Sequence, residues 1–260
     1  MYKSIILFLT LFLSSHAVAY KIEIDKKTEQ ELDKIITTKV IPNQHAEKSI
    51  LLNEISASFL DTPYKANTLI GSPTIAEALV INFNGVDCFT LLDYIQAISH
   101  STNKQTFLEN LIKTRYIDSN VSYLKRKHFF SDWFANSPKN ANDITNKISD
   151  SYITVTKHLN LKSDGGKFIP DLNIIERKIN YIPSDKVNSH TLQKLKTGDY
   201  IGIYSKLDGL DVSHVGMVIK KGDQIYYRNA SSLSKNMKVV DTPLLDYIRS
   251  RPGIIVLRSI

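Results

Sequence analysis

The hydrophobic pattern of this chain changes between its two halves, and this change limits the folds available to it. Residues 28–40 and 46–60 carry apolar side chains at three- and four-residue intervals, which predicts helices. From residue 197 onward the pattern predicts successive strands, at 198–204, 211–220, 224–229, 237–240 and 254–258. Helices first and a mostly antiparallel sheet last are typical of an α+β domain.

The chain's single cysteine lies at the head of a further predicted helix. Residues 79–83 are short, apolar and partly β-branched, which predicts a buried strand, and an Asn-Gly turn follows them. Residues 86–99 then carry apolar side chains at helical spacing, with Asp87 where an N-cap belongs. Strand, turn and helix together place Cys88 in an exposed first helical turn.

This position suits a catalytic nucleophile. Unpaired amides and the positive end of the helix dipole stabilise a thiolate, which is the form of cysteine that attacks carbonyl groups. We therefore expect the thiol pKa of Cys88 to lie below its ordinary value of about 8.5. The alternative is that Cys88 is a small buried residue of the core.

The first 19 residues have the pattern of a secretory signal peptide, with Lys3, an apolar run at 5–13 and small residues at 17–19. The run is too short to span a bilayer and no cysteine directly follows it, so we expect no membrane anchor after cleavage. The mature chain, residues 20–260, would form one domain, exported to the periplasm or, alternatively, secreted. An unpaired thiol in an oxidising compartment favours catalysis for Cys88.

Two stretches in the middle of the chain are irregular. Residues 120–134 mix basic and aromatic side chains, which we expect to cover the core rather than to stack on sugars. Residues 137–148 are polar and rich in Asn, which predicts a surface excursion. On either side, residues 107–116 predict a helix and residues 151–161 a strand or a helix.

The charge of the chain narrows the choice of partners. The formal charge is +7, but Lys and Arg are spread along the sequence and not clustered. For an exported protein, this favours anionic envelope material over nucleic acid. No HExxH motif or cluster of His, Asp and Cys ligands occurs in the sequence, so we expect neither a metal nor another cofactor.

A cysteine nucleophile needs a general base and a third polar group that orients the base. Of the seven histidines, His128 and His214 remain once loop-like positions are set aside, and His214 is placed best. It lies on a predicted strand that puts His214 and Gly216 on one face, where the glycine leaves room for another backbone or a substrate. The following hairpin returns a strand whose Asn229 can accept a hydrogen bond from the imidazole.

A cysteine on a helix, His-Val-Gly on a strand and a small-residue segment after a hairpin resemble the NlpC-like, papain-fold cell-wall hydrolases. In that family the last segment commonly reads His-Ala-Ser, whereas here it is Asn229-Ala230-Ser231. An Asn as the third catalytic residue is tolerated by papain-type enzymes. The resemblance implies a single papain-like α+β domain with N-terminal helices and a mostly antiparallel C-terminal sheet.

The chain is most similar to one branch, the N-acetylmuramoyl-L-alanine amidase-like proteins, which act on anhydro-muramyl peptides in envelope turnover. The similar segments span nearly the whole mature chain, at residues 62–64, 87–90, 126–133, 181–183, 198–199, 210–216, 229–231 and 252–258.

This resemblance implies a role for several residues. Cys88 would be the nucleophile, His214 the base and Asn229 the residue that orients the base. The Cys88 backbone N–H and the Tyr64 hydroxyl would hold the oxyanion, although Tyr64 fits a core aromatic equally well. Substrate-binding roles are implied for Asp87, Ser213, His128 and Trp133, with support of a loop as the alternative for the last two.

The sequence thus predicts an exported cysteine amidase that cleaves the amide between an N-acetylmuramoyl group, in its anhydro form, and L-alanine. Its partners would be peptidoglycan fragments. One alternative is a peptidoglycan endopeptidase that cuts within the stem peptide. The other is a non-catalytic envelope-binding module on the same fold.

Overall fold

The computed structural model describes residues 20–260, so the predicted signal peptide at 1–19 lies outside the described residues. The α-helices are α1 (Lys26–Ile35), α2 (Lys48–Ala57), α3 (Cys88–Ile98), α4 (Lys104–Arg115), α5 (Asp132–Ala135), α6 (Thr145–Ile148), α7 (Ser189–Lys194) and α8 (Leu244–Ile248). The strands are β1 (Lys21–Ile24), β2 (Ala78–Ile81), β3 (Ala141–Asp143), β4 (Ile153–Leu159), β5 (Ile175–Pro183), β6 (Tyr200–Tyr204), β7 (Val212–Lys221), β8 (Gln224–Ser231), β9 (Lys238–Pro243) and β10 (Gly253–Ser259).

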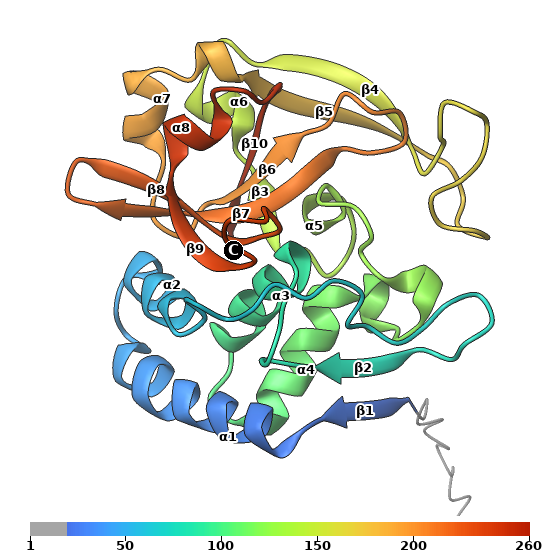
Figure 1. The fold of residues 1–260 in the computed structure, drawn as a ribbon, viewed down its shortest axis with the longest axis vertical. Helices are drawn as coiled ribbons and strands as arrows, with labels where there is room; N and C mark the ends of the chain where they lie inside the picture. The colour runs from blue at the N-terminus through green and yellow to red at the C-terminus, as the bar shows by residue number, and fades with distance from the viewer. Residues whose placement is uncertain (1–19) are drawn as a thin grey trace, which may run out of the picture.

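One large sheet organises the described part of the chain. Its strands follow the order β4-β5-β10-β6-β7-β8-β9, with β3 on β10, and the neighbouring strands pair antiparallel. Helices α1 to α4 form a layer on one side of this sheet, and α6, α7 and α8 lie on the other (Figure 1). Strands β1 and β2 form a separate parallel pair beside the helical layer. This arrangement confirms the α+β prediction.

Side chains of the sheet alternate between its two faces and so contribute to two apolar clusters. Val215 and Met217 of β7 belong to the cluster shared with the helical layer. Val218, from the opposite face of the same strand, packs in the second cluster with Leu244 and Ile248 of α8. The predicted face of His214, Gly216 and Val218 therefore looks away from the helical layer.

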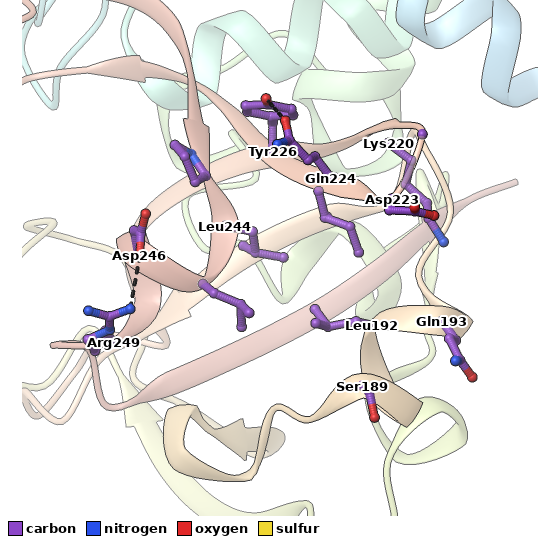
Figure 2. A pocket seen from close by; sticks show the side chains of 14 residues that line it. Ser189, Leu192, Gln193, Lys220, Asp223, Gln224, Tyr226, Leu244, Asp246 and Arg249 are labelled. Carbon is purple, nitrogen blue, oxygen red and sulfur yellow. Dashed lines mark hydrogen bonds and ion pairs between the residues drawn. The ribbon is translucent and has the colours of Figure 1, made fainter.

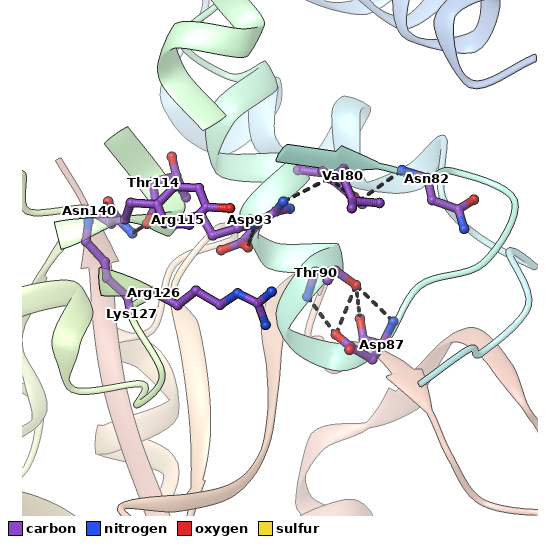
Figure 3. A network of polar contacts seen from close by, with 12 residues as sticks. Val80, Asn82, Asp87, Thr90, Asp93, Thr114, Arg115, Arg126, Lys127 and Asn140 are labelled. Atoms are coloured by element: carbon purple, nitrogen blue, oxygen red, sulfur yellow. Dashed lines mark hydrogen bonds and ion pairs between the residues drawn. The ribbon is translucent and has the colours of Figure 1, made fainter. Parts of the chain in front are cut away.

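Helix α3 runs through the centre of the molecule and contacts α2, α4, β7 and β8. A buried ion pair fixes its position, because Arg115 of α4 donates from Nε to Asp93 of α3 at 2.8 Å. The same guanidinium donates to the Val80 carbonyl of β2 at 2.8 Å (Figure 3). Two helices and a strand are thereby joined directly beneath the turn that carries Cys88.

Most of the predicted elements are confirmed. The helices expected at 28–40, 46–60, 86–99 and 107–116 correspond to α1 through α4, and a π-helical turn at Ile36–Val40 continues α1. The strands expected at 79–83 and beyond residue 197 correspond to β2 and to β6 through β10. The ambiguous stretch at 151–161 forms β4.

The surface excursion predicted at 137–148 is wrong. This stretch contains β3, which pairs with β10, and α6, and its polar residues Asn140 and Thr145 are buried. Asn140 donates to the Thr114 carbonyl at 2.8 Å, and the Thr145 hydroxyl accepts from the Val256 amide at 2.9 Å. Polar composition misled the prediction because these side chains satisfy internal backbone groups. Strands β1 and β5 were not predicted at all.

Candidate active site

The head of α3 has the geometry expected for its sequence. The Asp87 carboxylate accepts from the Thr90 amide at 2.8 Å, and the Thr90 hydroxyl accepts from the Asp87 amide at 3.0 Å (Figure 3). This reciprocal capping box sets where the helix begins. It therefore leaves Cys88 in the first turn, half-buried, where amides have no partner within the helix.

The surroundings of the sulfur overturn one expectation. The amides of Cys88, Phe89 and Val215 lie at hydrogen-bonding positions around it, and each favours the thiolate. Burial outweighs them, however, and together with the neighbouring Asp87 carboxylate it raises the pKa of the Cys88 thiol to about 12. The prediction of a lowered thiol pKa is therefore wrong for the free protein.

The predicted base and its orienting residue are in direct contact. The Asn229 Oδ1 lies 3.0 Å from the His214 Nε2, and the Asn229 Nδ2 donates to the Tyr227 carbonyl at 3.1 Å. Because the amide nitrogen is used in this way, Oδ1 must accept, so Nε2 carries the imidazole proton. Nδ1 is then the free basic nitrogen. Strand β7 pairs with β8 only from Met217 onward, so the amide of Val215, the residue after His214, is free to bond the sulfur of Cys88 where the two strands part.

The room predicted beside Gly216 is filled by an aromatic ring. A Cβ at Gly216 would lie 2.5 Å from the Tyr227 ring and 2.7 Å from the Arg228 carbonyl. The Tyr227 ring centroid lies 6.1 Å from that of His214, and its hydroxyl donates to the Ile201 carbonyl. The fully buried Tyr227 ring and the backbone of β8 at Arg228 fill this space, in line with the expectation of another backbone beside the glycine. The Tyr227 ring also flanks the imidazole on one side.

His214 is kept neutral by its surroundings. Burial lowers the pKa of its imidazole, and the charge of Arg251 lowers it further, although the hydrogen bond to Asn229 and the charge of Asp87 oppose this. With the thiol pKa raised and the imidazole pKa lowered, both groups are uncharged at neutral pH.

Tyr64 is held next to the head of α3 by backbone pairing. The residue bridges in parallel to Val86, and its amide donates to the Met237 carbonyl at 2.9 Å. Its side chain is half-buried, and burial together with Cys88 and Asp87 raises the pKa of the phenol, which keeps the hydroxyl protonated. A protonated phenol close to Cys88 can donate a hydrogen bond.

The model of a family described as AmiA-like, N-acetylmuramoyl-L-alanine amidase-like, matches residues 54–254. The chain belongs to this family. No curated protein matches the sequence.

Solved structures agree with the assignment to the amidase-like family. An N-acetylmuramoyl-L-alanine amidase from Bacteroides uniformis has a TM-score of 0.71 and 28% identity, over 82% of this chain and 99% of its own. A Bacteroides fragilis protein described provisionally as a xylanase has a TM-score of 0.64 and 31% identity, over 78% and 98%. A Legionella pneumophila protein shares the fold, with a TM-score of 0.75 and 22% identity over 90% and 95%.

In this amidase-like chain, two of the predicted substrate-binding residues flank the centre. Asp87 uses its carboxylate to cap α3, which is the role that the structure gives it. Ser213 is exposed beside His214, and its hydroxyl lies 3.5 Å from the Ile203 carbonyl. Ser213 is therefore accessible, whereas the Asp87 side chain is already engaged.

The other two are placed as structural residues. Trp133 is fully buried in an aromatic group with Phe89, Phe130 and Tyr200, which fits the structural role expected as the alternative to substrate contact. The His128 Nε2 lies 2.7 Å from the Tyr123 carbonyl, within its own loop. The expectation that this stretch covers the core is confirmed for Phe129, Phe130, Trp133 and Phe134, whereas Tyr123 is only half-buried.

Two residues near the base were missed by sequence reasoning. The Tyr247 ring centroid lies 6.2 Å from that of His214, and the Arg251 guanidinium lies over the Tyr247 ring at 5.4 Å. Both belong to the connection between β9 and β10, which carries no motif of its own. Only the position of that connection over β7 and β8 brings them to the imidazole.

A wide cavity lies away from these residues. It has a volume of about 700 Å³ and is bounded by α7, the β7–β8 turn and α8 (Figure 2). Within residues 20–260, no three or more His, Cys, Asp and Glu side chains are grouped so as to hold a metal ion. In the same range, no helix is both long and apolar enough to cross a membrane.

Proposed function

We propose that this chain is an exported cysteine amidase that cleaves the bond between an N-acetylmuramoyl group, in its anhydro form, and L-alanine. Membership of the amidase-like family supports the bond class. The observation that carries the cysteine mechanism is the His214–Asn229 contact of 3.0 Å, with Nδ1 left free next to the strand residue that touches the sulfur. The signal-peptide pattern at residues 1–19 supports a periplasmic location.

The reaction begins from the neutral pair. His214 Nδ1 takes the thiol proton as the sulfur of Cys88 attacks the lactyl carbonyl carbon, forming a C–S bond and an oxyanion. The Cys88 amide and the Tyr64 hydroxyl donate to that oxyanion. Attack and proton transfer are coupled, because neither the separated thiolate nor the imidazolium is favoured in this site.

Collapse of the oxyanion completes the first half. The C–N bond breaks, and the His214 imidazolium gives its proton to the amine of L-alanine, which leaves as the free peptide. Water then attacks the thioester, with His214 as base, and releases the muramic carboxylic acid and the Cys88 thiol. Asn229 keeps the proton on Nε2 through both halves.

The xylanase description of one structural neighbour is not carried over. Glycoside hydrolysis normally uses a pair of carboxylates that flank the scissile bond. The groups near Cys88 are instead backbone amides and the phenols of Tyr64, Tyr227 and Tyr247. The adjacent Asp87 carboxylate caps a helix. This chemistry fits acyl transfer.

A product analysis tests the proposal. Purified residues 20–260 are incubated with an anhydro-muramyl tetrapeptide, its non-anhydro counterpart and the free tetrapeptide, and the products are followed by mass spectrometry. We expect the bare anhydro sugar and an intact tetrapeptide, slower turnover of the non-anhydro form, and no product with Cys88→Ala. A sugar that still carries L-alanine and glutamate, or cleavage of the free tetrapeptide, would identify an endopeptidase instead. Binding without turnover would identify an envelope-binding module.

A further inference from the structure

A second cavity, of about 450 Å³, adjoins the proposed catalytic centre. One wall is formed by Tyr247 and Arg251, and the Tyr247 ring is the one that neighbours His214. The loop between β8 and β9 also lines the cavity, through Leu233, Lys235 and Asn236. This loop ends at Met237, whose carbonyl accepts from the Tyr64 amide. The cavity is thus bounded by the segments that touch the proposed base and the proposed oxyanion donor.

In the described part of the chain, the carboxylates that line this cavity form ion pairs within the protein, whereas the cations that line it do not. Its two carboxylates have partners within the protein, since Asp241 pairs with Arg228 at 2.7 Å and Asp246 with Arg249 at 3.0 Å (Figure 2). Its two cations, Lys235 and Arg251, have no carboxylate within ion-pair distance in the described part of the chain. The cavity therefore offers positive charge to a ligand.

The direction of proton transfer decides which part of the substrate lies here. The leaving amine must stand next to His214, because that imidazole gives it a proton. The peptide that follows the amine therefore extends into the space on the His214 side, along Tyr247. A peptide carries a carboxylate at its C-terminus, and acidic residues add further ones, which matches the uncompensated cations.

We infer that this cavity binds the peptide part of the substrate and that Arg251 and Lys235 select peptides that carry free carboxylates. The inference rests on the proposed amidase function, and it names the side of the site that reads the leaving group. Arg251 is a specificity-determining residue in this account. Its guanidinium lies over the Tyr247 ring, and that ring neighbours His214. The Arg251 side chain is exposed and can bind a carboxylate.

Kinetics with paired substrates test the inference. The full mature chain is assayed on a muramyl tetrapeptide with free carboxylates and on the same compound with these carboxylates amidated. We expect the wild type to prefer the free acid, and Arg251→Gln to raise KM for the free acid roughly tenfold with little change in kcat and to abolish the preference. Arg251→Lys should retain part of the preference for the free acid, and Lys235→Gln should raise KM for the free acid less than Arg251→Gln does.

Lys178→Gln is the control, because Lys178 is an exposed cation on β5 and does not line the cavity. It should leave KM and the preference unchanged. A further readout separates recognition from a purely structural role. Since Arg251 lowers the pKa of His214, Arg251→Gln should move the acid limb of kcat/KM to higher pH, whereas Lys178→Gln should not. Equal KM values for Arg251→Gln and Lys178→Gln would overturn the inference.

Binding measurements keep the two proposals apart. Calorimetric titration of the Cys88→Ala protein with the two muramyl peptides reports recognition without turnover. Tighter binding of the free acid, lost in Cys88→Ala/Arg251→Gln, supports the inference even if the wild type cuts a different bond. Equal binding of the acid and the amidated form overturns it, even if the amidase activity is found.

Discussion

Cys88 depends on its base because its own surroundings keep the thiol protonated. The helix amides stabilise the thiolate, but burial and the Asp87 carboxylate oppose it more strongly and raise the pKa to about 12. At neutral pH the protonated thiol is then the dominant form in the free protein. Substrate binding and His214 must therefore supply the activation.

Alkylation of Cys88 reports this protonation state. We expect iodoacetamide to react slowly with the native protein at neutral pH, with a rate that rises continuously into the alkaline range, because a raised pKa delays formation of the thiolate. Mass spectrometry at Cys88, the only cysteine, gives the rate directly. A rate plateau spanning mildly acidic to neutral pH would instead reveal a preformed thiolate–imidazolium pair.

Asn229 is expected to act through the tautomer of His214. Asn229→Leu removes the acceptor for Nε2, so the proton can move to Nδ1 and block the base; we expect kcat to fall roughly 10²–10³-fold with a smaller change in KM. Asn229→Asp keeps an acceptor of the same shape, and its negative charge raises the pKa of His214. It should therefore retain more activity and move the acid limb of the pH profile upward. Equal losses in both variants would assign the orienting role elsewhere.

At the scale of the elements, β7 and β8 hold the imidazole through a glycine. Gly216→Ala places a Cβ 2.5 Å from the Tyr227 ring and 2.7 Å from a backbone carbonyl, so the ring or the strand must move. We expect a loss of about 1–3 kcal/mol in the free energy of unfolding and a clear drop in kcat, because Tyr227 flanks His214.

Chemical denaturation and kinetics of the same variant measure both effects. Gly222→Ala is the control, because a Cβ there meets nothing within 4 Å, although φ of +58° adds about 1 kcal/mol of backbone strain. That variant should lose some stability but keep kcat. A Gly216→Ala protein with unchanged kcat would show that Tyr227 does not position the imidazole.

The elements that could be predicted from sequence are those specified by neighbouring residues. The capping box at Asp87 and the hairpin between β7 and β8 are local patterns, and they were sufficient to bring His214 and Asn229 together. What could not be predicted depends on contacts between distant segments. Tyr247 reaches the imidazole only because the β9–β10 connection crosses β7 and β8, and the thiol pKa of Cys88 depends on burial that no local pattern reports.

At the scale of the whole molecule, one buried arginine joins the helical layer to the sheet. Arg228 of β8 forms two hydrogen bonds with Asp241 of β9, at 2.7 and 2.9 Å. Its third nitrogen donates to the Ser56 hydroxyl of α2 at 2.8 Å. The guanidinium is almost fully buried, and the adjacent residue in β8 is Asn229. The two halves of the active site are therefore tied together next to the residue that orients the base.

Replacing this arginine should weaken that connection in a pH-dependent way. Arg228→Met leaves the Asp241 carboxylate with only the exposed Lys221 as partner, so we expect a loss of about 3 kcal/mol in the free energy of unfolding at neutral pH.

Burial alone would raise the pKa of Asp241, but Arg228 and Lys221 hold it below its usual value. The stability that this carboxylate contributes is thus present above its unfolded pKa of about 3.9 and is lost as the pH falls through the folded value. Urea denaturation should show the difference in free energy of unfolding between wild type and Arg228→Met narrowing as the pH falls below about 4. The control variant Lys221→Met, which removes the exposed partner, should lower the free energy of unfolding by less than about 1 kcal/mol. A loss as large as that of Arg228→Met would show that the hydrogen bond from Arg228 to Ser56 of α2 contributes nothing to stability.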